Sequence, residues 1–154
     1  PDRREANGHR VTFTPKEARE SDLFLTVLSM REEQTARFPV DIAELPDAFV
    51  LTLADWAVVL NKTGELLAKP LALTVRSEGN VQLLVACLAP GPWSLSGEGG
   101  QPAYNTHVNV ARNAAFFVVP AGEYTLRPGM LSGAPAYEAP PEFMPAPSQP
   151  IEME

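Results

Sequence analysis

Sixteen prolines and ten glycines interrupt this 154-residue chain, and their spacing constrains the fold more than any other feature. Proline fixes φ and lacks a backbone N–H, while glycine adopts turn conformations easily, so both residues tend to end regular elements. The intervals between them are too short for long helices but suit strands of about five or six residues. The sequence therefore predicts an all-β protein: a single β-sandwich or jelly-roll-like domain with one short N-terminal helix and extended terminal arms.

Composition divides the chain into three parts. Residues 1–10 form a polar N-terminal arm, residues 11–127 a β-rich domain, and residues 128–154 a Pro-rich extended C-terminal tail. At the start of the domain, Thr14 is a good helix N-cap because Pro15 and Glu17 occupy the first and third helical positions. This helix must be short, since residues 23–30 follow as a strand that is apolar on both faces.

Seven further short strands are predicted, with turn signals between them. Residues 61–64 and 77–80 contain glycine where a hairpin needs positive φ, and residues 41–45 are expected to form one helical turn before Pro46. The predicted strands are residues 38–40, 49–53, 57–60, 65–68, 71–76, 81–88 and 104–111.

Candidate catalytic and metal-binding residues are few. The chain has two histidines, His9 and His107, and one cysteine, Cys87, with no ligand pair at a recognisable spacing. Cys87 lies in an apolar run and is expected to be a buried small side chain rather than a nucleophile activated by His107. The sequence therefore predicts no catalytic residues, no metal site, no cofactor and no disulfide, which is the profile of a non-enzymatic protein.

Charge and hydropathy exclude other classes. A net charge of −7 disfavours nucleic-acid binding, which needs a basic surface. No apolar stretch is long enough to span a bilayer, and no leader sequence is recognisable, so neither membrane association nor secretion is predicted.

Three aromatic residues could instead form a carbohydrate-stacking platform. Trp56, Trp93 and Tyr104 lie near predicted turns, and flat rings stack on sugar faces. The same positions are usual for aromatic residues that close the end of a sandwich core, so both interpretations stay open.

The tail is the strongest functional lead. It holds prolines and glutamates but no Lys or Arg, which favours an extended backbone without a core of its own. Its apolar side chains Tyr137, Phe143, Met144 and Ile151 are spaced as anchors for a surface. That surface could be an edge strand of the same domain or a neighbouring subunit.

In architecture the chain resembles the accessory structural proteins of tailed-phage virions, which include capsid decoration, fibre-base and adaptor proteins. The resemblance rests on the small β-rich domain, the terminal arms, and Pro/Gly hairpins such as residues 119–126 (VPAGEYTL), which echo residues 88–95 (LAPGPWSL). It implies a homo-oligomer, with a trimer favoured, that binds other structural subunits such as a major capsid protein. Such a protein would be assembled in the host cytoplasm and be found in the virion. A structural assembly role is therefore the leading hypothesis, and a carbohydrate-binding β-sandwich module is the alternative.

Overall fold

The computed structural model describes residues 14, 17, 25–27, 39–99 and 101–138. The chain divides into two compact units, Pro1–Gln34 and Thr35–Glu154, and the seven strands that the structure describes lie in the second unit. The N-terminal arm, the predicted helix and the predicted strand at residues 23–30 lie almost entirely outside the described residues. The strands are β1 (Val40–Glu44), β2 (Ala48–Leu53), β3 (Trp56–Asn61), β4 (Leu71–Val85), β5 (Gly91–Gly97), β6 (Ala103–Val108) and β7 (Ala115–Pro128).

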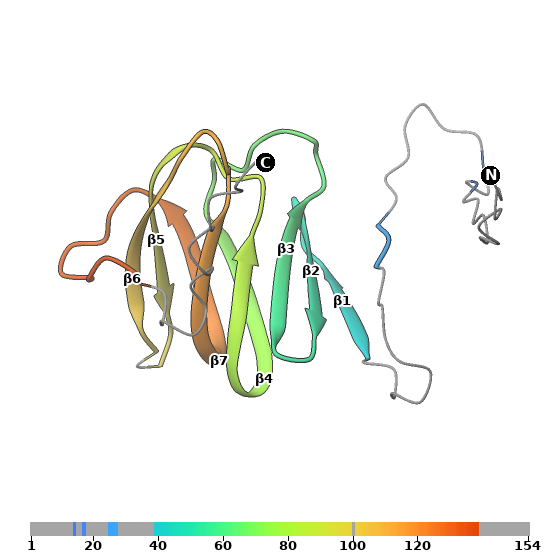
Figure 1. Cartoon of the computed structure of the whole chain (residues 1–154), viewed down its shortest axis with the longest axis horizontal. Helices are drawn as coiled ribbons and strands as arrows, with labels where there is room; N and C mark the ends of the chain where they lie inside the picture. The colour runs from blue at the N-terminus through green and yellow to red at the C-terminus, as the bar shows by residue number, and fades with distance from the viewer. Residues whose placement is uncertain (1–13, 15–16, 18–24, 28–38, 100, 139–154) are drawn as a thin grey trace, which may run out of the picture. The chain divides into compact units, whose positions relative to one another are not determined.

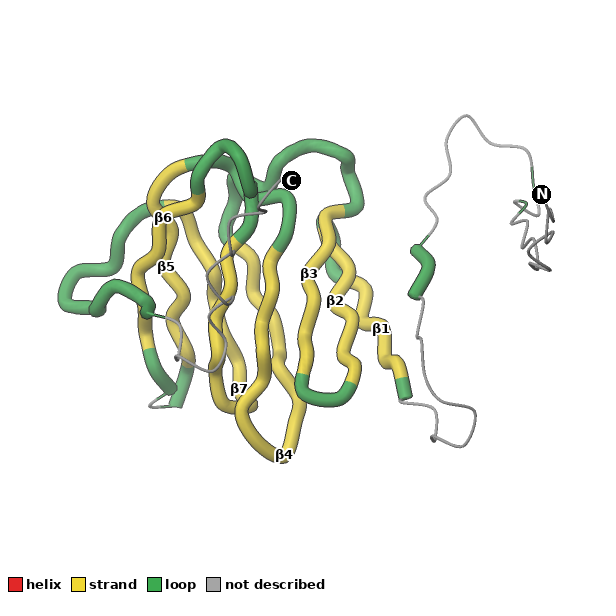
Figure 2. Tube along the Cα trace, viewed as in Figure 1, coloured by secondary structure: helices red, strands yellow, loops and turns green. Residues whose placement is uncertain are grey.

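All seven strands belong to one hydrogen-bonded sheet with the order β1-β2-β3-β4-β7-β5-β6 (Figure 1). The sheet doubles over because β4 and β7 are long and both change direction near their middles. Their pairing shifts register between Val75 and Asn80, opposite the bend at Ala121 and Gly122. Figure 2 shows β4 as two limbs joined at the lower end of the view. The result is a two-layer β-sandwich, and the predicted all-β fold class is confirmed.

The first layer contains β1, β2, β3, the second half of β4 and the first half of β7. The second layer contains the first half of β4, the second half of β7, β5 and β6. This arrangement explains how β3 and β4 pair in parallel without a crossover helix. Parallel neighbours need a long return connection, and the first half of β4 supplies it by running through the opposite layer.

The core lies between the layers and draws on both halves of each long strand. Leu73 and Leu83 come from the two halves of β4, and Phe117 and Tyr124 from the two halves of β7. All four side chains are almost completely buried. Because side chains alternate along a strand, a single apolar alternation in β4 fills the core from both sides.

Gln101 and Tyr124 hold the bend in β7. The Gln101 amide donates a hydrogen bond to the Ala121 carbonyl oxygen (3.2 Å), and the Tyr124 hydroxyl donates to the Pro120 carbonyl oxygen (2.8 Å). These bonds satisfy backbone oxygens at the position where the ladder with β4 is interrupted. Residues 119–126, predicted as a hairpin, are therefore one bent strand.

Three local predictions are corrected. Residues 41–45 form most of strand β1 and not a helical turn, because pairing with β2 satisfies their backbone groups. Residues 77–80 do turn the chain, but the flanking segments both pair with β7 and not with each other. Residues 65–68 contribute only an isolated bridge between Leu67 and Leu88. In the part of the chain that the structure describes, no helix is long and apolar enough to cross a membrane.

Candidate functional site

The outer faces of the two layers differ in chemistry. Register pairing places apolar side chains from five strands on the outer face of the first layer. The outer face of the second layer is polar, with Thr74, Glu123, Thr125, Ser96 and His107 on it. A solvated antiparallel layer normally alternates apolar-in and polar-out, so the first layer is the unusual one. Its outer apolar residues are Val40, Ile42, Phe49, Leu51, Leu53, Trp56, Val58, Leu60, Leu84, Phe116 and Val118.

Trp56 and Phe116 form an aromatic pair on this apolar face. Their ring centroids are 6.0 Å apart and the ring planes are inclined by 46°, across the intervening strand β4. Both side chains are half-buried. Beside Trp56, Gln82 occupies the paired position on β4 and donates from its side-chain amide to the Asp55 carboxylate (3.0 Å). The Gln82 backbone N–H also donates to the Asp55 carbonyl oxygen (2.7 Å), so two bonds fix Asp55 beside the rings.

The other two predicted stacking residues belong to the core. Trp93 is 1% exposed, and its indole N–H donates to the Ala89 carbonyl oxygen (2.8 Å). Its ring therefore has no free face for a sugar. Tyr104 packs against the core from β6, and its ring centroid lies 5.2 Å from that of Tyr137. Of the three, only Trp56 lies on an outer face.

The start of the tail packs on its own domain, where Asn105 of β6 holds it. The Asn105 side-chain amide donates to the carbonyl oxygens of Leu131 (3.0 Å) and Ala134 (2.8 Å), and its oxygen accepts from the Leu131 N–H (2.7 Å). The Asn105 backbone donates to the Pro135 oxygen and accepts from the Tyr137 N–H, both at 2.7 Å. These contacts place residues 135–137 along the outer edge of β6, which covers an edge strand that would otherwise be open to pairing.

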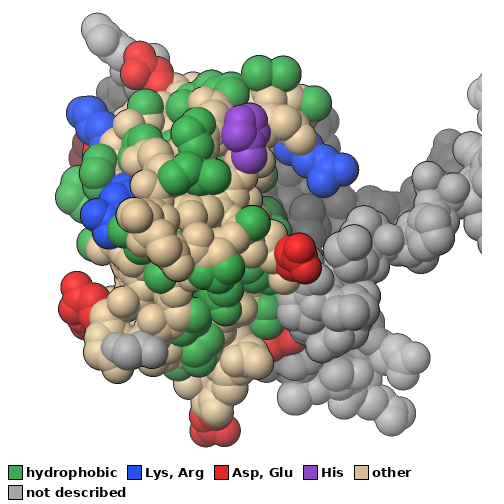
Figure 3. Space-filling view, turned by 90° about the vertical axis from the view of Figure 1, so that its left-hand side faces the viewer, with side chains coloured by type: hydrophobic (Ala, Val, Ile, Leu, Met, Phe, Trp, Pro, Cys, Tyr) green, Lys and Arg blue, Asp and Glu red, His purple; other side chains and the backbone are tan. Residues whose placement is uncertain are grey.

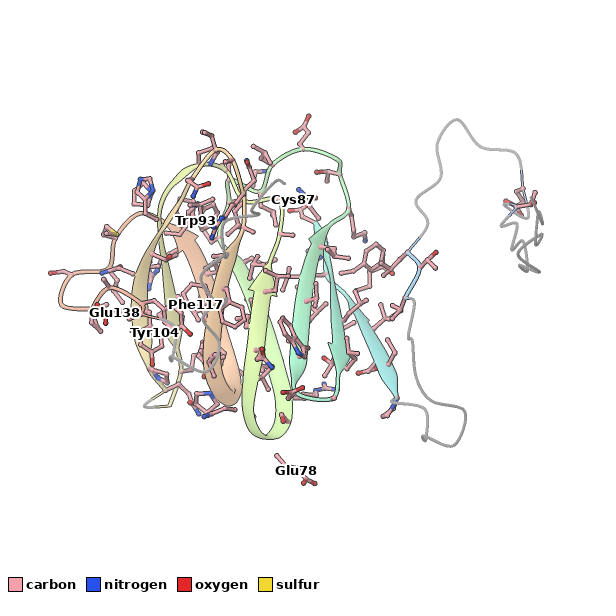
Figure 4. The ribbon with its side chains drawn as sticks, in the orientation of Figure 1. Glu78, Cys87, Trp93, Tyr104, Phe117 and Glu138 are labelled. Carbon is pink, nitrogen blue, oxygen red and sulfur yellow. The ribbon has the colours of Figure 1, made fainter. Side chains whose placement is uncertain are left out.

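Tyr137 closes the gap between the two layers on this side. Its ring centroid lies 5.0 Å from that of Phe117 and 5.2 Å from that of Tyr104, both in T-shaped geometry, and its hydroxyl oxygen accepts the Val118 N–H (2.7 Å). Figure 4 shows Tyr104 and Phe117 close together in this region. Burial raises the pKa of Tyr137, and the hydrogen bond from Val118 opposes that shift. Tyr137 thus contacts its own domain, which is one of the two surfaces considered for the tail from the sequence. Phe143, Met144 and Ile151 lie outside the described residues.

Cys87 and His107, the two residues weighed as nucleophile and base, both lie at the surface. Cys87 was expected to be buried, but it is exposed and has φ of +59°, because it lies in the turn that follows β4. His107 is also exposed, and in Figure 3 charged groups of both signs are scattered over the described surface around it. Between residues 39 and 138 no group of three or more His, Cys, Asp or Glu side chains is placed to hold a metal ion.

The connection between β3 and β4 forms an open hollow of about 190 Å³, lined by polar residues such as Asp47 and Glu65 and by apolar ones such as Leu66. The Asn61 side chain bonds within this loop, accepting from the backbone N–H and the hydroxyl of Thr63 and donating to the Glu65 carbonyl oxygen. These bonds organise the loop itself and bring no reactive group into the hollow.

Sequence reasoning missed Phe116 and Asn105. Phe116 lies beside Phe117 in the sequence, and only strand alternation shows that the two rings face opposite sides. A single polar residue in an alternating strand gives no signal that it will be buried beneath a loop that lies 26 or more residues further along the chain.

In a comparison with protein families, the sequence model described as Heparinase II C-terminal domain matches residues 43–128. That range covers more than half of the chain and includes every strand from β2 to β7. A search of curated proteins found no match.

Proposed function

This chain belongs to the Heparinase II C-terminal domain family, and on that basis we propose that it is a non-catalytic β-sandwich module that contacts carbohydrate. The family name places such domains beside a polysaccharide-acting enzyme. Among the described residues, no group of three or more His, Cys, Asp or Glu side chains is placed to hold a metal ion. An accessory, binding role agrees with both observations.

The observation that carries the proposal is the arrangement around Trp56. A half-buried indole with a carboxylate and an amide fixed beside it provides a stacking surface and hydrogen-bonding groups, which together form a typical sugar site. The C–H face of a pyranose ring packs on the aromatic surface, and the sugar hydroxyls exchange hydrogen bonds with Asp55 and Gln82.

Charge suggests which glycans would bind. The net charge is −7, and acidic residues outnumber basic ones between residues 39 and 138. A polyanion such as heparin is repelled by a surface of that sign. The proposed ligand is therefore a neutral or weakly charged glycan, and binding should depend little on salt.

Glycan-array screening followed by calorimetry tests the proposal. Trp56→Ala should weaken binding by about tenfold, which corresponds to about 1.4 kcal/mol of lost stacking. Phe49→Ala is the matched control, because Phe49 is a half-buried ring on the same face but lies at its other end. The carbohydrate-binding role is rejected if no neutral glycan binds the intact chain. It is also rejected if Trp56→Ala binds glycan with the same affinity as the control Phe49→Ala.

The virion assembly role expected from the architecture remains a prediction. Its main support was a tail free to reach other subunits, and residues 129–138 instead lie along their own domain. The trimer and the capsid partner also remain predictions.

A further inference from the structure

Strands β1 and β6 lie at the two ends of the strand order of the sheet (Figure 1). Residues 135–137 lie along β6, with a parallel bridge between Asn105 and Ala136. Among the described residues, β1 pairs only with β2, and all five residues of β1 are exposed. The described part of the chain therefore covers one end of its sheet and leaves the other end open to pairing.

The hydrogen bonds between β1 and β2 determine which backbone groups of β1 point toward the open side. The Leu45 N–H donates to the Ala48 carbonyl oxygen (2.8 Å) where the two strands join. Because bonded and non-bonded pairs alternate along an antiparallel ladder, Ala43 and Asp41 also bond to β2. The other residues of β1 direct both N–H and C=O away from β2. These residues are Val40, Ile42 and Glu44.

The side chains of β1 give this open edge little protection. Val40 is 42% exposed and Ile42 is 51% exposed, and both lie on the apolar outer face of the first layer. Edge strands are commonly protected by lysine, proline or a bulge, but β1 contains no lysine or proline and its register with β2 is regular. The carboxylate of Glu44 is paired with Lys62. A second extended backbone with an apolar side chain at its centre therefore suits this edge.

A second copy of the chain meets these requirements in one register. Two antiparallel β1 strands bond only where residues with outward backbone groups lie opposite each other. When the pair is centred on Ile42, this residue lies opposite Ile42 of the second copy, and Val40 lies opposite Glu44. Three bonded pairs then give about six hydrogen bonds. Asp41 lies opposite Ala43, so no like charges face each other directly.

The neighbouring registers are less favourable. Centring the pair on Asp41 places two aspartates opposite each other, and centring it on Glu44 places two glutamates opposite each other. Centring it on Ala43 avoids both repulsions but keeps only two of the three bonded pairs. The register centred on Ile42 combines the most hydrogen bonds with no direct repulsion.

We propose that the chain forms a two-fold dimer in which β1 pairs antiparallel with β1 of a second copy, centred on Ile42. Each copy uses one edge, so the assembly closes at two subunits, whereas the resemblance to virion proteins favours a trimer. The paired strands span only about 17 Å, so the dimer is weak and depends on concentration. Each copy carries a net charge of −7, and salt strengthens the association by screening this repulsion.

Sedimentation equilibrium of the intact chain over a range of concentrations, at low and at high salt, tests the dimer. The expected result is a monomer–dimer equilibrium that shifts toward the dimer at high salt. A chain that stays monomeric at every concentration, or that forms a trimer, would overturn the proposal. A dimer that dissociates at high salt would contradict it as well, because charge pairs would then hold the copies together.

Charge substitutions at the centre of the pair test the register. Ile42→Lys and Ile42→Glu each place like charges opposite each other, so each alone should raise the dissociation constant of the dimer by about tenfold. An equal mixture of the two should associate again, because Lys then faces Glu, and this recovery also shows that both variants are folded. If either variant alone dimerises like the intact chain, or if the mixture stays monomeric, the pairing is refuted.

Val40→Lys is the matched control, since Val40 is an exposed apolar residue of the same strand. In the proposed register it faces Glu44 of the second copy, so the variant should dimerise at least as well as the intact chain. Loss of the dimer as large as that caused by Ile42→Lys would refute the register. These measurements need no glycan, so their outcome is separate from that of the carbohydrate-binding role.

Discussion

Replacement of Asn105 by alanine tests whether this side chain holds the start of the tail. The change removes three hydrogen bonds, two donated to Leu131 and Ala134 and one accepted from Leu131. At about 1 kcal/mol each, they contribute about 3 kcal/mol. Leu131 and Ala134 are half-buried, so water can replace part of the hydrogen bonding that their backbone groups lose with the Asn105 side chain. The expected loss in the free energy of unfolding is therefore about 2–3 kcal/mol.

Urea unfolding followed by the fluorescence of buried Trp93 measures this loss. For a chain of this size it corresponds to a fall in Tm of about 5–10 °C. Amide exchange gives the local readout, because the N–H groups of Leu131 and Tyr137 are both bonded to Asn105. In the variant, the Leu131 amide should exchange faster even under conditions in which the core stays protected.

Two further variants make the interpretation specific. Asn105→Asp keeps the shape but faces the carbonyl oxygens of Leu131 and Ala134 with a carboxylate, so it should be at least as unstable as the alanine variant at neutral pH. Asn80→Ala, at an exposed position, should change stability by less than about 0.5 kcal/mol. If Asn105→Ala costs less than about 0.5 kcal/mol, or if the aspartate variant retains full stability, Asn105 does not hold the segment as described.

Three other predictions concern the same layers. Tyr137→Phe removes the acceptor for the Val118 N–H and should lower the free energy of unfolding by about 1 kcal/mol in urea titrations; an unchanged value would mean that water replaces the hydroxyl without cost. Gly97→Ala should cost about 1–3 kcal/mol because its new Cβ would clash with the Gln101 side chain and lie 2.9 Å from the Tyr124 ring. Gly79→Ala meets no atom within 4 Å and should be nearly neutral, and equal effects of the two changes would contradict this packing. Burial raises the pKa of Tyr124 to about 12 from its ordinary value of 10.0. The folded chain thus holds this proton more tightly, and its stabilising effect should be complete below pH 10 and disappear as the pH rises to about 12. Urea unfolding between pH 8 and pH 12 should show this decline, and a Tyr124→Phe variant should show less of it.

The sequence was sufficient to predict the strands whose signal is local. Residues 49–53 and 57–60 alternate or run apolar between clear turns, and β2 and β3 form at these positions. The division of strands between two layers was not predictable, because it depends on pairing between β4 and β7 across about 40 residues of sequence. Turn chemistry at residues 77–80 indicates that the chain reverses, but it does not indicate which strand the flanking segments will pair with.

Burial was predicted least well where the chain leaves a strand. Cys87 continues an apolar run, yet β4 ends at Val85 and the next turn exposes the thiol. Trp93 and Trp56 each lie beside a turn, and only the register of their strands decides that one ring faces the core and the other faces outward. A one-residue difference in register exchanges the two faces, and hydrophobicity alone does not specify it when both faces are apolar.

The two strands shared by both layers have a mechanical consequence. In a sandwich built from separate sheets, the layers meet only through side chains and can shear along that plane. Here the backbones of β4 and β7 cross from one layer to the other side by side, hydrogen-bonded for most of their length. A force that pulls the layers apart must break this ladder before the core can open, so the domain should resist extension as a single unit and unfold in one step. The corner formed by Arg76–Asn80 and Ala121–Gly122 is the position at which that resistance concentrates.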